Sequence, residues 1–190
     1  LEQNGFSNIA GADYSIEQLN NARNILDKVE LFECNNKSIY SIIEKIEPYL
    51  LVMLGSLEHF LEPRKVISKI FSCSKINYLL IAVPLFSFST LVELSSESTW
   101  ARQLSSSHTH LYTEKSLIYL MNEFSFSPVA SWYYGQDIID LFRHMLWDSK
   151  SNEEGKKLIS SMLKSHFNPL QKAIDQCSLS DQITILFKRD

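Results

Sequence analysis

The sequence lacks the features by which nucleic-acid-binding proteins are usually recognised. Its 18 Lys and Arg residues are outnumbered by 22 Asp and Glu residues, the formal net charge is -4, and no basic block stands out. Because clustered positive charge is what neutralises phosphates, nucleic acid is not an expected partner.

Cysteine pairs and long apolar runs are missing as well. Cys34, Cys73 and Cys177 are odd in number and form no CxxC motif, which favours reduced thiols over a disulfide or zinc framework. The longest apolar run, residues 78–86, is interrupted by Pro84 and is too short to span a bilayer. The first residues show no signal-peptide pattern. We therefore expect a cytoplasmic protein without a membrane partner.

Apolar strands alternate with amphipathic helices over the first half of the chain. Helices are expected to begin at Ser15 and at Pro63, and a third carries Ile39, Ile43 and Ile46 on one face. The segments with the composition of strands are residues 8–13, 29–34, 50–54 and 77–83. This alternation predicts an α/β fold with a mostly parallel sheet. The length is typical of a single domain, covering residues 1–190.

The second half of the chain is expected to hold a lid or substrate-facing segment and a helical insertion. Residues 85–112 carry many serines and are longer than most connections, as lids and binding loops are. After Thr113, which is typical of a helix N-cap, the expected elements are a helix, a strand at 129–134, helices within 136–177 and an antiparallel last strand at 182–188.

The chain is arranged around Tyr49 to Pro63, YLLVMLGSLEHFLEP. Leu50 to Leu54 has the apolar character of a strand buried on both faces. Glu58 and His59 follow just beyond its carboxyl end, where open α/β sheets bind their ligands. This corner is therefore a candidate site.

Four segments taken together resemble class I S-adenosylmethionine-dependent methyltransferases. They are NGFSNIAGADYSIEQLNNA at 4–22, LEHFLEP at 57–63, Val83-Pro84 and HTHLYTEKSL at 108–117. The first resembles the family's second strand and following helix. The last resembles relatives that modify sugars and other small metabolites. The resemblance covers nearly the whole chain and implies a Rossmann-like fold, S-adenosyl-L-methionine as cofactor and a small-molecule acceptor.

The resemblance also implies a cofactor site. Asp13 would accept hydrogen bonds from the ribose hydroxyls, with Tyr14 beside it. A short carboxylate at the tip of a strand suits this role because it can accept two hydroxyls at once. The residues that would line the pocket near the methionine part of the cofactor are Gly55, Ser56 and Leu57. The alternative for Asp13 is a turn residue that precedes a helix cap.

Methyl transfer to a hydroxyl or amine needs alignment and a place for a proton. A histidine is the natural base because its ordinary pKa lies near neutrality. The candidates are His59, with Glu58 to orient its ring, and His108 and His110. A structural hydrogen bond is the alternative role for His59, and an ordinary loop position is the alternative for the other two. The candidates for substrate contacts are Glu58, Trp100 and Tyr112, with packing as the alternative for the two aromatic residues.

A metal ion is not expected at the Glu58-His59 corner. Some ubiquinone-type and RNA-end methyltransferases place additional carboxylates just ahead of this pair to hold magnesium. Here Leu54, Gly55 and Ser56 occupy the nearest positions, so the oxygen ligands that a hard cation prefers are absent.

The glycine-rich loop of the family has no counterpart in this sequence. It should lie about 20 residues before the ribose-binding acid, and Asp13 leaves no room for it. Without the first strand, the strands at Ile9 and Leu50 would each keep an unpaired edge. We therefore expect that the natural protein is longer at its amino end, or that another chain supplies the strand.

Two other classes of function remain open on the sequence alone. A nucleotide-cofactor oxidoreductase would use the same alternation and the same acid, although LEHFLEP and HTHLYTEKSL argue against it. A non-catalytic, methyltransferase-like interaction domain would explain the missing loop. An edge strand near the carboxyl terminus also leaves a homodimer open.

Overall fold

The computed structural model describes residues 4–6, 8–26, 28–95, 101–104, 107–148 and 153–190. The strands are β1 (Ala10–Asp13), β2 (Glu30–Glu33), β3 (Leu50–Leu54), β4 (Tyr78–Pro84), β5 (Phe126–Tyr134) and β6 (Gln182–Arg189). The helices are α1 (Ile16–Arg23), α2 (Ser38–Ile46), α3 (Pro63–Ser72), α4 (Phe88–Ser95), α5 (Glu114–Asn122), α6 (Asp137–Asp148) and α7 (Glu153–Gln176).

Three helices begin where the sequence predicts, for local chemical reasons. The Ser15 hydroxyl accepts from the N–H of Gln18 and so caps α1. Thr113 and Ser116 form a reciprocal capping box at α5, and Pro63 occupies the first turn of α3. Each device satisfies a backbone donor that the first helical turn leaves free, or removes one.

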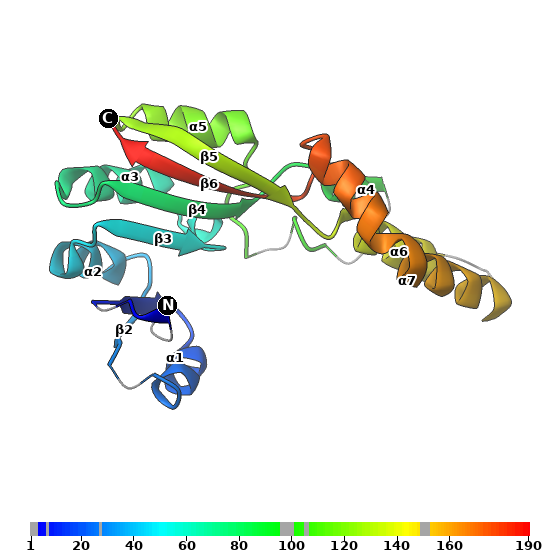
Figure 1. Cartoon of the computed structure of the whole chain (residues 1–190), viewed down its shortest axis with the longest axis horizontal. Coiled ribbons are helices and arrows are strands. Elements are labelled where there is room, and N and C mark those ends of the chain that lie inside the picture. Colours follow the sequence, from blue (N-terminus) through cyan, green and yellow to red (C-terminus); the bar gives the residue numbers. More distant parts are fainter. Residues whose placement is uncertain (1–3, 7, 27, 96–100, 105–106, 149–152) are drawn as a thin grey trace.

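The strands form two sheets. β1 and β2 pair in parallel, and the larger sheet has the order β3-β4-β6-β5. β3 runs parallel to β4, whereas β6 is antiparallel to both of its neighbours. The predicted α/β fold with an antiparallel last strand is therefore confirmed. Figure 1 shows the small sheet beside the β3 edge of the large one, and among the described residues β1 and β3 are not hydrogen-bonded to each other.

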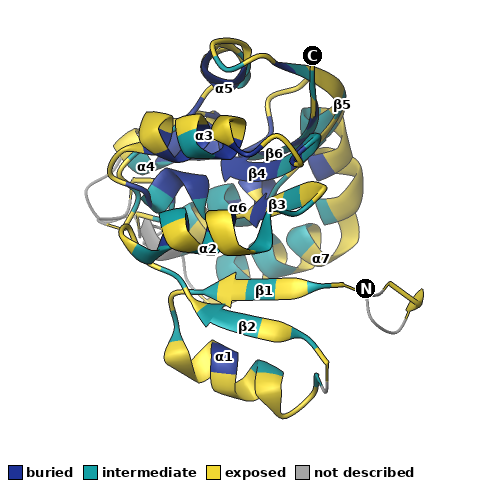
Figure 2. Ribbon diagram, turned by 90° about the vertical axis from the view of Figure 1, so that its left-hand side faces the viewer, coloured by how far each residue is buried: buried dark blue, intermediate teal, exposed yellow. Residues whose placement is uncertain are grey.

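The core lies between the large sheet and helices α2, α3 and α5. Ile70 of α3, Leu117 of α5 and Ile185 of β6 are fully buried in one cluster. Figure 2 shows buried residues concentrated in the large sheet and its helices, whereas β1 and β2 hold only exposed and intermediate residues and α1 buries only Leu19. At about 25 cal/mol per Å² of apolar surface, this cluster supplies most of the driving force for folding.

The expectation that β3 is a strand buried on both faces was wrong. β3 is not buried on both faces, because Leu50, Val52 and Leu54 are all exposed and only Met53 is buried. β3 is an edge strand of its sheet, and its buried face meets the core helices.

The second half of the chain adds detail to the prediction in two places. The serine-rich segment after Pro84 contains helix α4, and the helices expected within 136–177 are α6 and one long helix, α7, with Pro169 inside it. Helices α6 and α7 project together from the end of the sheet (Figure 1). An internal proline costs a helix about 3 kcal/mol, and packing of α6 along α7 is available to offset it.

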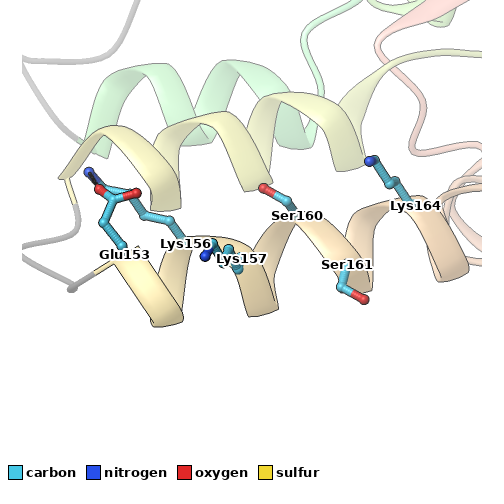
Figure 3. Close-up of a pocket in the computed structure, with 6 residues that line it drawn as sticks. All are labelled: Glu153, Lys156, Lys157, Ser160, Ser161 and Lys164. Carbon is cyan, nitrogen blue, oxygen red and sulfur yellow. Dashed lines mark hydrogen bonds and ion pairs between the residues drawn. The ribbon is translucent and has the colours of Figure 1, made fainter.

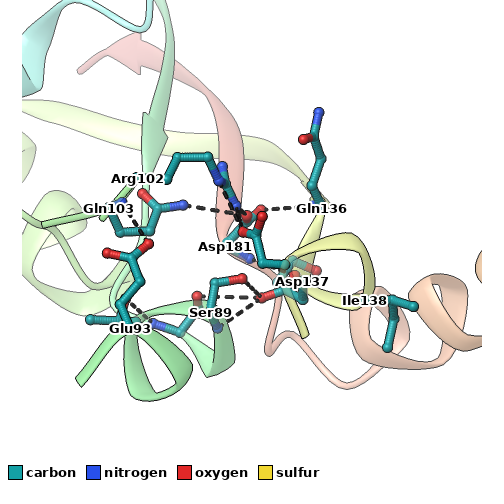
Figure 4. Close-up of polar contacts among 12 residues, drawn as sticks. Ser89, Glu93, Arg102, Gln103, Gln136, Asp137, Ile138 and Asp181 are labelled. Carbon is teal, nitrogen blue, oxygen red and sulfur yellow. Dashed lines mark hydrogen bonds and ion pairs between the residues drawn. The ribbon is translucent and has the colours of Figure 1, made fainter. Parts of the chain in front are cut away.

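A buried polar network joins α4, α6, α7 and the start of β6. The Asp137 carboxylate accepts from the Ser89 hydroxyl at 2.9 Å, from Gln171 Nε2 at 3.1 Å and from the N–H of Asp181 at 3.0 Å. Arg102 forms ion pairs with Asp140 and Asp181. Figure 4 shows Asp181 between Arg102, Gln103 and the backbone of Gln136. The network ties the segment after β4 to the helical insertion.

The raised pKa of the buried Asp181 carboxyl predicts that the free energy of unfolding falls as the pH rises. Burial first, and the Asp137 charge second, raise the pKa of Asp181 from its ordinary 3.8 to about 6, although Arg102 opposes this. The folded protein therefore holds a proton that the unfolded chain releases between about pH 4 and pH 6. We expect the free energy of unfolding to decrease across this window by at most about 3 kcal/mol, measured by urea denaturation.

The Asp181→Asn variant tests this linkage, because it removes the titrating group and keeps one acceptor oxygen. Its unfolding free energy should lose that decrease between pH 4 and pH 6. Glu17→Gln, which removes an exposed carboxylate from α1, is the control and should keep the decrease. An unchanged pH profile in the Asp181 variant would contradict the assignment.

Candidate active site

The corner after β3 depends on a glycine. Gly55 has a φ of +56°, in the left-handed region that favours glycine, and its N–H donates to the carbonyl of Ala82 in β4 at 2.9 Å. The chain then turns into a short 3-10 helix, Leu57–His59. This turn places Glu58 and His59 immediately beyond the carboxyl end of β3, as the sequence predicts.

The segment that carries His108 and His110 is held against this corner. The N–H groups of Thr109 and His110 donate to the carbonyl of Glu58 at 2.9 and 3.2 Å. The Thr109 hydroxyl reaches the same carbonyl at 2.8 Å and that of Phe60 at 3.0 Å. Residues about fifty positions apart in the chain are thereby fixed in one place.

The same segment also pairs with the end of β4. Leu85 forms an isolated parallel bridge with Tyr112, and the N–H of Phe86 donates to the carbonyl of Tyr112 at 2.7 Å. The rings of His110 and Tyr112 stack with centroids 6.1 Å apart. The rings of His59 and His108 lie 5.0 Å apart. The structure thus brings together five of the predicted residues, namely Glu58, His59, His108, His110 and Tyr112.

Hydrogen bonds indicate which nitrogen of each ring carries the hydrogen. His59 Nδ1 lies 2.7 Å from the carbonyl of Ser107, and His108 Nδ1 lies 2.9 Å from the carbonyl of Gln103. A carbonyl only accepts, so both Nδ1 atoms donate and both Nε2 atoms keep a lone pair. Glu58 does not orient the His59 ring through Nδ1, because the carbonyl of Ser107 does so.

His110 reaches the same tautomer through a hydroxyl. The single hydrogen of the Thr109 hydroxyl points to a backbone carbonyl, so its oxygen accepts from His110 Nδ1 at 2.9 Å. The lone pair of His110 is therefore on Nε2. A neutral imidazole held in this way can take up a proton without first rearranging.

The Glu58 side chain is buried beside two of these rings. It is 2% exposed, and its Oε2 has no hydrogen-bond partner among the described residues. Its Oε1 lies 3.9 Å from His59 Nε2. Burial raises the pKa of Glu58, against a backbone hydrogen bond and the charges of His59 and His108, which lower it. A buried carboxylate oxygen without a hydrogen-bond partner is energetically costly and is typical of functional sites.

Tyr112 places a second buried polar atom at the site. Its side chain is 6% exposed and its hydroxyl has no partner among the described residues. Burial, followed by the Glu58 charge, raises the pKa of Tyr112. Its phenol therefore stays protonated and is available as a hydrogen-bond donor.

The residues predicted to hold the cofactor differ in how accessible their side chains are to a ligand. Asp13 ends β1 and is half-buried, and its Oδ1 accepts from the N–H of Ser15 at 2.8 Å, so it also serves as the predicted turn residue. Tyr14 is 81% exposed. The side chain of Leu57 is fully buried in the core, which leaves only its backbone for a ligand. Trp100 lies outside the described residues.

The carbonyls of Gln103 and Ser107 are the part of the site that sequence reasoning missed. They fix the tautomers of His108 and His59. Backbone carbonyls occur at every residue, so no residue type signals this role.

A separate open groove runs along α7 and carries mostly basic and hydroxyl side chains. Figure 3 shows its lining, which consists of Glu153, Lys156, Lys157, Ser160, Ser161 and Lys164. All of these belong to one helix, and a salt bridge joins Lys156 to Glu153. This is the expected solvated face of a surface helix. Within the described residues, no helix has the length and apolar character needed to cross a membrane.

Comparisons with solved structures identify the fold. A SAM-dependent methyltransferase from Archaeoglobus fulgidus matches with a TM-score of 0.52 and 12% identity, over 95% of this chain and 75% of its own. The small RNA methyltransferase HEN1 matches with a TM-score of 0.54 and 14% identity, over 96% of this chain and 20% of its own. The [4+2]-cyclase SpnF matches with a TM-score of 0.50 and 11% identity, over 95% of this chain and 65% of its own.

The fold is therefore the α/β fold of class I methyltransferases. No protein-family model matches the chain, and no curated protein sequence matches it. The identities are low and the cyclase shares the fold, so the likeness concerns architecture alone.

Proposed function

We propose that this protein is an S-adenosylmethionine-dependent methyltransferase that acts on a small molecule. A sugar or a related cell-surface or secondary metabolite is the leading class of acceptor. The observation that carries the proposal is the convergence of Glu58, His59, His108, His110 and Tyr112 beyond β3 and β4. In open α/β sheets this edge is where ligands bind, and the fold is the one that class I methyltransferases use.

The residues present suit the cofactor at two points. The half-buried Asp13 at the end of β1 offers a carboxylate to the ribose hydroxyls, and Gly55 lets a ligand approach the backbone after β3. When bound, the cofactor supplies an electrophilic methyl group on a sulfonium. Alignment of the acceptor with that methyl group accounts for much of the rate in such a transfer.

The base that we propose for a hydroxyl or amine acceptor is His110. Its Nδ1 hydrogen is engaged by Thr109, so Nε2 is the atom that would take up the acceptor's proton when the methyl group leaves the sulfonium for the acceptor. Tyr112, whose ring stacks on that of His110 and whose hydroxyl has no partner among the described residues, would donate a hydrogen bond to the acceptor.

Cofactor binding is tested by isothermal titration with S-adenosylhomocysteine. Residues 1–190 and the complete natural gene product are both titrated, because β1 and β3 each have one edge without a strand partner among the described residues. Asp13→Asn should weaken binding by about 10- to 100-fold, the equivalent of one or two charge-assisted hydrogen bonds. Asparagine keeps an acceptor for Ser15, so α1 stays capped.

Glu17→Gln, an exposed change in the first turn of α1, is the matched control and should bind as the unmodified protein does. If neither sample binds S-adenosylhomocysteine, the proposal fails and a non-catalytic interaction domain takes its place. If both bind but Asp13→Asn has no effect, the ribose role of Asp13 fails alone.

A further inference from the structure

Three side chains at the corner after β3 form a cluster of the kind that can bind a metal ion. Glu58, His59 and His108 each offer one ligand atom, and these atoms all lie within 4.8 Å of one another. The ligand atoms of a tetrahedral zinc site are about 3.4 Å apart. Side-chain movements on the order of 1 Å would therefore close the group around an ion.

The two histidines are already held in the form that binds a metal. Each donates its Nδ1 hydrogen to a backbone carbonyl, that of Ser107 for His59 and that of Gln103 for His108. Metal-binding histidines usually have this outer hydrogen bond, because it fixes the ring and leaves the other nitrogen as ligand. The same segment thus supplies His108 and the groups that orient both rings.

Glu58 gives a second and independent indication. Its side chain is almost fully buried, and Oε2 has no partner among the described residues. Burying a carboxylate oxygen without a partner costs about 1 to 3 kcal/mol or more. A cation bound by the Glu58 carboxylate and the two rings would compensate this buried charge, whose Oε1 already lies 3.9 Å from His59 Nε2.

We propose that Glu58, His59 and His108 bind a divalent transition-metal ion through one carboxylate oxygen and two Nε2 atoms. Two histidines and one glutamate form a ligand set that suits zinc. Three protein ligands leave a position for water or for an oxygen of a bound small molecule. The expectation of a metal-free corner considered magnesium, which prefers oxygen ligands, whereas the nitrogens here select a different class of ion.

The proposal does not depend on methyl transfer, and its test uses the metal alone. Purified, chelator-treated protein is titrated with Zn²⁺ by calorimetry, and Co²⁺ serves as a spectroscopic probe of the ligands. We expect one equivalent to bind and to raise the thermal unfolding midpoint. Glu58→Gln and His108→Ala should each weaken Zn²⁺ binding at least about 100-fold, since loss of an outer hydrogen bond alone costs 10- to 100-fold.

Two matched controls separate this site from surface binding. His166 on α7 also has its Nδ1 bound to a carbonyl, at 3.2 Å from Met162, and Glu62 is an exposed acid paired with Lys65. His166→Ala and Glu62→Gln should bind Zn²⁺ as the unmodified protein does. If they weaken binding as much as the corner variants do, or if no one-to-one binding occurs, the proposal is overturned.

A further test measures the thermal unfolding temperature of Glu58→Gln in the absence of metal. The change removes a buried charge whose Oε2 has no hydrogen-bond partner among the described residues, so the metal-free variant should unfold at the same temperature as the unmodified protein or higher. It should also lose the stabilisation by Zn²⁺. If Glu58→Gln retains that stabilisation in full, Glu58 is not a ligand and the proposed site is wrong.

Discussion

Gly135→Ala is expected to destabilise the protein by about 3 kcal/mol or more, as overpacking and broken hydrogen bonds combine. A β-carbon at this position would lie 2.1 Å from Asp181 Oδ1 and 2.7 Å from Asp137 Oδ2. Neither carboxylate can retreat easily, because Asp181 is paired with Arg102 and Asp137 accepts five hydrogen bonds. Urea denaturation measures the loss in unfolding free energy.

Gly11→Ala is the matched control, because its β-carbon also meets a close neighbour. That neighbour is Leu31 Cδ2 at 2.8 Å, the end of a flexible side chain on β2. A leucine can change rotamer at low cost, so we expect a loss of less than about 1 kcal/mol. Equal losses in the two variants would show that rigid buried carboxylates are not what makes Gly135 necessary.

The elements with clear local signals were predicted well. α2 carries Ile39 and Ile43 into the core, and β4 and β6 have the apolar character that strands at the centre of a sheet require. Helix α4 was missed because its sequence, FSTLVELS, has no strong helical period. Tertiary contacts support it instead: the N–H of Ser89 donates to Asp137, and Glu93 accepts from two backbone N–H groups.

The candidate site was predictable to the extent that it depends on side-chain type. Glu58 and His59 follow a strand, and the sequence alone places them at its carboxyl end. The sequence also named His108 and His110, but not their contact with the corner, because backbone hydrogen bonds to the carbonyl of Glu58 make it. Which of two nearby histidines approaches His59 depends on the path of the chain, and no local pattern encodes that path.

The burial of Asp137 and Asp181 was equally hidden in the sequence. Each acid stands near the start of an element, where an exposed cap is the usual expectation. Both are fully buried instead, because the segment after β4 folds over them and supplies Arg102 and Ser89. Arg102 and Gln103 enter this network, and the carbonyl of Gln103 also accepts from His108 at the corner. The network therefore helps to fix the position of His108.

Asp137→Ala is expected to cost about 3 kcal/mol of unfolding free energy, measured by urea denaturation. The Asp137 carboxylate accepts from the hydroxyls of Ser87 and Ser89, from two backbone N–H groups and from Gln171. Donors left without a partner in a buried site cost about 1 to 3 kcal/mol each. The loss is limited because the variant also removes the Asp137 charge, which after burial is the second cause that raises the pKa of Asp181.

Asp175→Ala provides the comparison within the same part of the fold. Asp175 is itself half-buried, and it accepts from Gln171 at 2.9 Å and from the Ser180 hydroxyl at 2.7 Å. Its loss should cost about 1 kcal/mol, the usual contribution of such bonds. Because Asp137 holds α4 against α6 and α7, its variant should also speed backbone hydrogen exchange in α4, whereas Asp175→Ala should not. If exchange in α4 is unchanged in Asp137→Ala, the network does not hold that helix in place.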